Sequence, residues 1–225
     1  MSPEERWQTC RSLLYNPSEQ NWERLCFLLT EWPPEHRQEL LLSYIEQHLE
    51  HWPRESPRRW SSGWPLPWRV APDDWKKKAL SGHEPPFGWS LVRFLDYHYE
   101  GETLGDQPLV TMLQKGWLQP LTHLSLTGCQ LRGDFLSEVI ASQCMPSLTH
   151  LVLYGNQLDT RKLCDFLQSP CCETLQSLDL GACNLHDRVA LAIAESSSLK
   201  QLKTLMLPYN YLGMEGVYAL ARTES

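Results

Sequence analysis

The residues best suited to chemistry in this sequence are histidines and an aspartate that recur at a fixed spacing. His123 and His150 are 27 residues apart, and Asp96 lies 27 residues before His123. On neighbouring strands, about 4.8 Å apart, two imidazoles and a carboxylate would be suitable ligands for a transition metal. A polar column that faces solvent or a partner requires no metal, and we expect this simpler arrangement.

The cysteines also show a spacing that resembles a zinc site. Cys144 and Cys171 are 27 residues apart, and Cys164 and Cys172 lie nearby. In a repeat these cysteines would fall on neighbouring helices, which pack about 8–10 Å apart, whereas zinc–sulfur bonds are about 2.3 Å long. We therefore predict no metal site here.

No other group of residues predicts catalysis or a cofactor. His48 and His51 lie three residues apart without an evident third ligand, so we expect a solvated helix face. Phosphate-binding glycine motifs, the serine-nucleophile motif G-x-S-x-G and the zinc motif H-E-x-x-H are absent. Cys10 and Cys26 fall on apolar helix faces and are expected in the core. We predict that the protein is not an enzyme and has no catalytic residue.

Composition and charge narrow the class further. The 225-residue chain has a net charge of −7, which disfavours an extended nucleic-acid interface, and neither half carries a polybasic membrane anchor. The first residues lack the basic and apolar regions of a signal peptide, and no apolar run is long enough to cross a membrane. We expect a cytoplasmic protein with reduced cysteines.

A 27-residue repeat positions these residues. Its units are 121–147, 148–174, 175–201 and 202–225, and each opens with the pattern L-x-x-L-x-L-x-x-N/C-x-L. Alternating leucines share one face of a short strand, and the second half of each unit has helical spacing. Residues 94–120 fit the same frame, except that Glu102 occupies the Asn/Cys position. We interpret 94–120 as a degenerate repeat; an unrelated strand–helix segment is the alternative.

The pattern resembles the leucine-rich-repeat family, and the repeat length resembles its ribonuclease-inhibitor-like subclass. The resemblance implies an α/β solenoid, a short horseshoe with parallel strands on its concave side and helices on its convex side. It also implies that side chains at the Asn/Cys position, such as Cys129 and Cys183, satisfy backbone groups in the turn. Proteins of this subclass bind protein partners through the concave face.

Residues 1–93 lack the repeat and predict a small, mainly helical, tryptophan-rich domain. Helix starts are expected at Ser2, Asn16 and Pro33-Pro34, with a short fourth helix from Pro72 to Leu80. The region weakly resembles the helical segments that precede repeats in some bacterial leucine-rich-repeat proteins. Segment 52–70 either covers the edge of the first repeat or forms a ligand surface with its arginines. Its marked residues are Trp52, Trp60, Trp64, Trp68, Arg54, Arg58 and Arg59.

The repeat frame leaves one set of strand side chains outside the core, and we predict that they bind a protein partner. Their polar and aromatic mixture, with acidic members, suits a partner with a basic or polar patch. The predicted site residues are Asp96, His98, His123, Ser125, His150, Val152, Tyr154, Asp179, Met206, Tyr209 and Tyr211, and Glu100 belongs to one of the same columns.

Two alternatives to this binding module remain open. No polar cap follows the last repeat, so the chain could self-associate there. The repeats could also recognise the substrate of an enzyme or effector whose chemistry lies in residues 1–93; unusually reactive Cys10 or Cys26 would favour that role.

Overall fold

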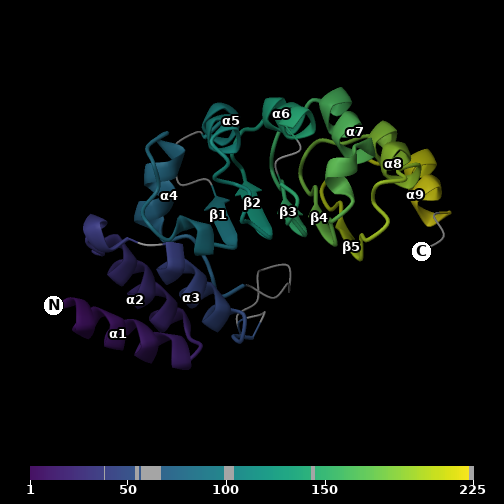
Figure 1. Cartoon of the computed structure of the whole chain (residues 1–225). Helices are drawn as coiled ribbons and strands as arrows, with labels where there is room; N and C mark the ends of the chain where they lie inside the picture. Colours follow the sequence, from purple (N-terminus) through teal and green to yellow (C-terminus); the bar gives the residue numbers. More distant parts are fainter. Residues whose placement is uncertain (38, 54–55, 57–66, 99–103, 143–144, 223–225) are drawn as a thin grey trace. The chain divides into compact units, whose positions relative to one another are not determined.

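A computed structural model describes all residues of the chain except 38, 54–55, 57–66, 99–103, 143–144 and 223–225. The chain forms two compact units. The first comprises Met1–Ala79 and His83–Phe94, and the second comprises Leu80–Gly82 and Leu95–Ser225. In the described part of the first unit the regular elements are helical, whereas the second unit alternates strands with helices (Figure 1).

The first unit is built from short helices. Its elements are α1 (Pro3–Tyr15), α2 (Glu19–Thr30), the 3₁₀ turn η1 (Pro34–His36), α3 (Glu39–Leu49), α4 (Asp73–Leu80) and the 3₁₀ turn η2 (Trp89–Leu91). At α1 the expected start is confirmed: Glu5 N donates to Ser2 Oγ at 3.2 Å, and Ser2 N donates to a Glu5 carboxylate oxygen at 2.6 Å. This reciprocal pair satisfies two backbone donors at the helix end.

Two helix starts expected from the sequence are wrong by a few residues. Helix α2 is capped by Ser18, not Asn16, because the Ser18 hydroxyl accepts from Asn21 N at 3.1 Å. The two prolines at 33–34 open only the turn η1, and α3 begins at Glu39. An extended Arg37 (ψ 96°) ends that turn, so the helical run is interrupted.

Tryptophans dominate the interior of the first unit. Trp22 and Trp75 are each 1 % exposed, and their indole N–H groups donate to Val70 O and Thr30 Oγ1 at 2.7 and 2.8 Å. A buried indole needs such a partner, because an unpaired N–H away from water costs free energy. Trp52 likewise donates to Leu14 O at 2.8 Å.

The second unit contains a five-stranded parallel sheet with flanking helices. Its strands are β1 (Phe94–His98), β2 (His123–Thr127), β3 (His150–Val152), β4 (Ser177–Asp179) and β5 (Thr204–Met206), which lie in this order in the sheet. Its helices are α5 (Gln107–Gln114), α6 (Asp134–Ser142), α7 (Thr160–Gln168), α8 (Asp187–Ala194) and α9 (Met214–Ala221), with the 3₁₀ turn η3 (Pro170–Cys172).

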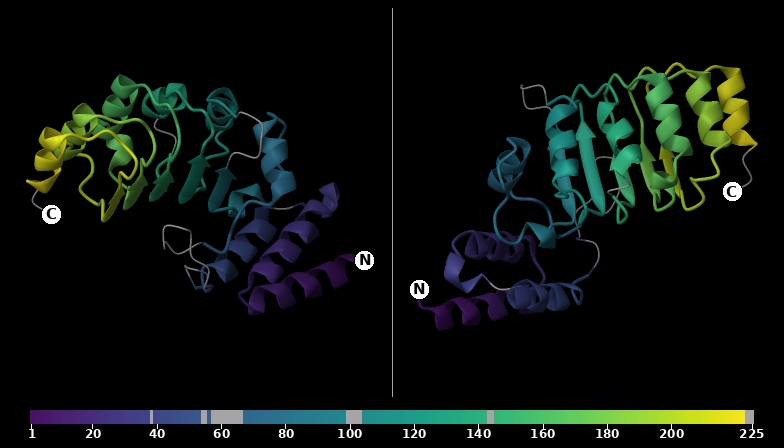
Figure 2. Two further views of the ribbon diagram at one scale, coloured as in Figure 1. Left: turned by 180° about the vertical axis from the view of Figure 1, so that it is seen from behind. Right: turned by 45° about the horizontal axis from the view of Figure 1, so that its top comes forward.

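The register of the sheet follows the 27-residue spacing. His123 pairs with His150, His150 with Ser177, and Ser177 with Thr204. Helices α5–α9 lie along one face of the sheet (Figures 1 and 2). The repeat leucines fill the layer between strands and helices; Leu124, Leu151 and Leu178 are at most 1 % exposed. The expected α/β arrangement with parallel strands is therefore confirmed.

Candidate functional site

The turns after the strands are held by the Asn/Cys positions of the repeat. Asn156 Nδ2 donates to Leu126 O and Leu153 O at 2.7 and 2.8 Å, and its Oδ1 accepts from Leu131 N at 3.0 Å. Asn210, one repeat after Cys183, makes equivalent bonds: its Nδ2 donates to Leu180 O and Leu207 O, and its Oδ1 accepts from the N–H groups of Cys183 and Leu185. These bonds fix where each strand ends, and they place the side chains of neighbouring strands in columns.

We call the strand face opposite the helices the open face. Its side chains alternate with the buried leucines, so they point away from the helical layer. They are Asp96, His98, His123, Ser125, Thr127, His150, Val152, Tyr154, Ser177, Asp179, Gly181, Thr204, Met206 and Pro208.

The two repeated histidines stack on the open face. The ring centroids of His123 and His150 are 4.1 Å apart, and their planes are 9° from parallel. Thr122 Oγ1 lies 2.8 Å from His123 Nδ1, and Thr149 Oγ1 lies 2.9 Å from His150 Nδ1. Burial first, and then the neighbouring His150, lower the pKa of His123 to about 3. This imidazole is therefore neutral at physiological pH.

Asp96 lies on β1, where one of its carboxylate oxygens is 3.9 Å from His98 Nδ1. No group of three or more His, Cys, Asp or Glu residues with metal-site geometry occurs in the part of the chain that the structure describes. The stacked histidine rings present parallel rather than converging nitrogens, and such an arrangement does not surround a metal ion.

Three predicted site residues are more buried than a solvent-facing role implies. Ser125 is 0 %, Val152 5 % and Asp179 6 % exposed. The expectation that open-face residues have no packing role is wrong for these three, because side chains from adjacent strands on the same face cover one another. Tyr154 and Met206 are partly exposed.

Tyr209 and Tyr211 follow β5 and are the most exposed of the predicted site residues, at 79 % and 66 %. Tyr209 has a left-handed backbone (φ 57°), and the equivalent residues in earlier repeats share it: Gly128, Gly155 and Ala182 have φ of 66°, 72° and 52°. A bulky residue is disfavoured in this region, where glycine is not. The chain thus presents a large aromatic side chain at a position where its earlier repeats use glycine or alanine.

Several residues marked from the sequence lie outside the described part of the structure. They are Arg54, Arg58, Arg59, Trp60, Trp64, Glu100, Glu102 and Cys144. Within segment 52–70, Trp52 and Trp68 are described, and their rings meet edge to face at 6.2 Å. The role expected for this segment stays a prediction.

The seven described cysteines are free thiols. Cys10 and Cys26 are 0 % and 1 % exposed, as expected for the core. Burial raises the pKa of Cys10 to about 12 and raises the pKa of Cys26 as well. A thiol that stays protonated and buried is a poor nucleophile. The geometry therefore gives no support to covalent chemistry at these two residues.

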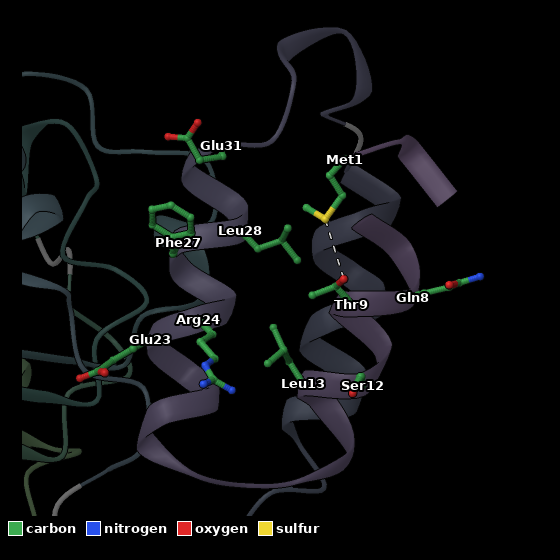
Figure 3. A pocket seen from close by; sticks show the side chains of 10 residues that line it. All are labelled: Met1, Gln8, Thr9, Ser12, Leu13, Glu23, Arg24, Phe27, Leu28 and Glu31. Atoms are coloured by element: carbon green, nitrogen blue, oxygen red, sulfur yellow. Dashed lines mark hydrogen bonds between the residues drawn. The ribbon is translucent and has the colours of Figure 1, made fainter. Parts of the chain in front are cut away.

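A groove of about 820 Å³, which was not predicted from the residue pattern, lies between α1 and α2 in the first unit (Figure 3). Leu13 and Leu28 point into it from the two helices, and Phe27, 71 % exposed, stands at its rim. Single exposed apolar residues are common on protein surfaces, so this pattern is hard to recognise before the helices are placed together.

On the open face, Tyr154 and Gly181 are in contact, a relation that was not predicted from the residue pattern. The two residues are 27 positions apart, so they are neighbours in one column. A Cβ atom built on Gly181 would lie 2.7 Å from Tyr154 Cδ2 and 3.0 Å from Pro208 Cγ. A tyrosine next to a glycine in one column could have predicted this contact, because the ring can occupy the space that a side chain at the glycine would fill.

Comparison with known proteins agrees with the repeat. A family model described as Leucine Rich repeat matches residues 171–194, which include the strand β4 and the helix α8. This match supports a leucine-rich-repeat protein. A search of curated proteins finds no match to the chain. Among the described residues, no helix is long and apolar enough to cross a membrane.

Proposed function

We propose that this protein is a non-catalytic interaction module that binds a protein partner through the open face of its strands. The observation that carries the proposal is the placement of Tyr209 and Tyr211. Both are large, exposed aromatic side chains at the end of the strand face, and Tyr209 adopts a backbone conformation that a tyrosine rarely takes. Tyrosine is enriched where protein surfaces meet, because it buries much area at low entropic cost.

The finer structural part of the proposal is a short solenoid of the ribonuclease-inhibitor-like subclass, with the open face as its concave side. The 27-residue period and the strand–helix alternation support it. Residues 1–93 are proposed as a separate helical domain that precedes the repeats in the sequence, and the site of action is proposed to be the cytoplasm. The leucine-rich repeat itself generally mediates contacts between proteins.

The test is an affinity pull-down from native lysate with wild-type chain and two open-face variants. The variants are Tyr154→Ala/Asp179→Lys and Tyr209→Ala/Tyr211→Ala, and each must keep the wild-type circular dichroism spectrum. The matched control is Tyr15→Ala/Asp165→Lys, which makes the first pair of changes at exposed positions on α1 and α7. A protein recovered by wild type and control but lost with either variant supports the module. Equal recovery by all four chains contradicts it.

A second candidate function is self-association through α9 and the residues after β5. Met214, Val217 and Tyr218 are 65 %, 49 % and 55 % exposed, which is unusual for three apolar or aromatic residues on one short helix. Mass measured by light scattering across a range of concentrations tests it. A rise in mass that Val217→Glu abolishes favours this function, and a constant monomer mass excludes it.

A further inference from the structure

Just after β3 and β4 end, three open-face residues, Tyr154, Gly181 and Pro208, lie close together, and we call this place the corner. The Tyr154 ring lies directly over Gly181: a Cβ at that glycine would meet ring carbons Cδ2 and Cε2 at 2.7 and 2.9 Å. Pro208 approaches the same point from the next repeat, at 3.0 Å. Gly181 thus lies between the Tyr154 ring and Pro208, and a side chain at position 181 would displace the ring.

A carboxylate lies at the same glycine. Asp179 Oδ1 accepts a hydrogen bond from Gly181 N at 2.8 Å. Because Asp179 lies two residues before Gly181, the two residues are on the same face of the strand. Asp179 is 6 % exposed, and this bond is the one that its side chain makes within the described part of the chain. A carboxylate has lone pairs for several donors. Most of its capacity to accept hydrogen bonds is therefore left for a group that arrives from outside.

Two serine hydroxyls on the open face also lack hydrogen-bond partners among the described residues. Ser177 Oγ and Ser125 Oγ are buried and have no hydrogen-bond partner among the described residues. Ser177 lies two residues before Asp179 on the same face of β4, and it pairs in register with His150. A buried hydroxyl without a partner costs free energy, and a ligand that brings a donor removes that cost.

The Asp179 carboxylate is the acidic group of this corner, and burial and hydrogen bonding act on its pKa in opposite directions. Burial raises the pKa of Asp179, but the hydrogen bond from Gly181 opposes this shift.

We infer that Asp179, Tyr154 and Gly181 form a binding site for an arginine side chain of the protein partner. This inference rests on the proposed function and specifies the partner's chemistry. A guanidinium group is planar and always charged, so it can stack on the Tyr154 ring while it donates hydrogen bonds to the Asp179 carboxylate. A lysine ammonium fits less well, because it lacks the planar face and the forked donors.

The experiment is a nuclear magnetic resonance titration of the full chain with a blocked Gly-Arg-Gly tripeptide. Two matched probes replace the arginine by lysine or by citrulline, which keeps the shape but loses the charge. The arginine probe is expected to shift the Gly181 amide resonance in a saturable way. The lysine probe is expected to bind several-fold more weakly, and the citrulline probe at least about tenfold more weakly. Equal binding of arginine and citrulline probes overturns the site.

Three substitutions test whether the arginine probe binds at Asp179 and Tyr154. Asp179→Asn keeps an oxygen that can accept from Gly181 N but loses the charge, and it is expected to weaken the arginine probe about tenfold or more. Asp187→Asn is the matched control, because Asp187 Oδ1 also accepts from a glycine N–H, that of Gly213 at 2.6 Å. Tyr154→Leu is expected to reduce the preference for arginine over lysine. Unchanged affinity in Asp179→Asn overturns the inference.

The pull-down keeps this inference distinguishable from the proposed function. If the arginine probe leaves Gly181 unperturbed while the open-face variants still lose the partner, the arginine site is wrong and the interaction module stands. If neither open-face variant loses a partner that wild type captures, the module itself is overturned.

Discussion

Repeat 175–201 and repeat 202–225 share one residue pattern but differ in how completely that pattern is buried. Leu178 is 0 % exposed, whereas its equivalent Leu205 is partly exposed. Ala190 is 1 % exposed, and its equivalent Val217 is 49 % exposed. Each repeat buries its apolar face against its neighbours, and the last repeat has only one in the described chain. We therefore expect that the stability contributed by a residue in this unit depends on its position in the array as much as on its type.

Replacing the paired leucines should give the largest difference. Leu178→Ala removes a fully buried side chain and is expected to lower the free energy of unfolding by about 2–5 kcal/mol. Leu205→Ala is expected to cost about half as much, because part of that side chain is already in contact with water. Urea unfolding followed by circular dichroism measures both. Equal losses would show that the last repeat is covered in solution.

The paired asparagines extend the comparison to hydrogen bonds. Asn156 is 1 % exposed and satisfies three backbone groups, so Asn156→Ala is expected to cost about 3 kcal/mol. Asn210 is partly exposed, and water can replace some of its bonds, so Asn210→Ala should cost about 1–2 kcal/mol. Urea unfolding of the two variants tests this, and a larger loss for Asn210 would contradict the expected order.

The stacked pairs His123–His150 and His186–Tyr211 allow a buried and an exposed histidine to be compared as pH changes. Because the pKa of His123 is lowered to about 3 when folded, the unfolded chain binds more protons below its ordinary pKa near 6.5. Stability from this group is thus present above pH 6.5 and lost as pH falls, by at most about 1.4 kcal/mol per unit. His123→Gln should flatten stability between pH 7 and 5. The control is His186→Gln, which changes the exposed ring stacked on Tyr211 at 5.6 Å; an equal flattening there would contradict the assignment.

The smallest effects are expected at two aspartates that both accept from a glycine N–H. Burial raises the pKa of Asp179, so the folded chain holds that proton more tightly, and stability falls as pH rises through the raised pKa. Asp179→Asn should therefore stabilise the chain slightly at pH 7, by less than about 1 kcal/mol. Asp187 begins α8, where a negative charge is favourable, so Asp187→Asn should destabilise by about 0.3–1 kcal/mol. Thermal unfolding at pH 7 compares them; the same sign for both would contradict this account.

Prediction from sequence succeeded where the physical signal was local or periodic. The capping box at Ser2 and Glu5 needs residues three apart, and the 27-residue spacing of His123 and His150 predicted their placement on neighbouring strands. It failed at Ser18 and at Pro33-Pro34, where several cap residues or prolines competed and the better hydrogen bond or an extended residue decided the start. Small errors of this kind are common at helix ends.

A strict 27-residue period leaves each strand one way to pair with the next, so the residue pattern alone predicts the repeat, the strand register and the members of each column. The tertiary structure decided how these columns are used. It showed that Tyr154 fills the space above Gly181, that Asp179 is buried with spare acceptors, and that Tyr209 is exposed in a left-handed conformation. Burial and ring placement depend on what neighbouring strands contribute to the same point in space, and no single stretch of sequence contains that information.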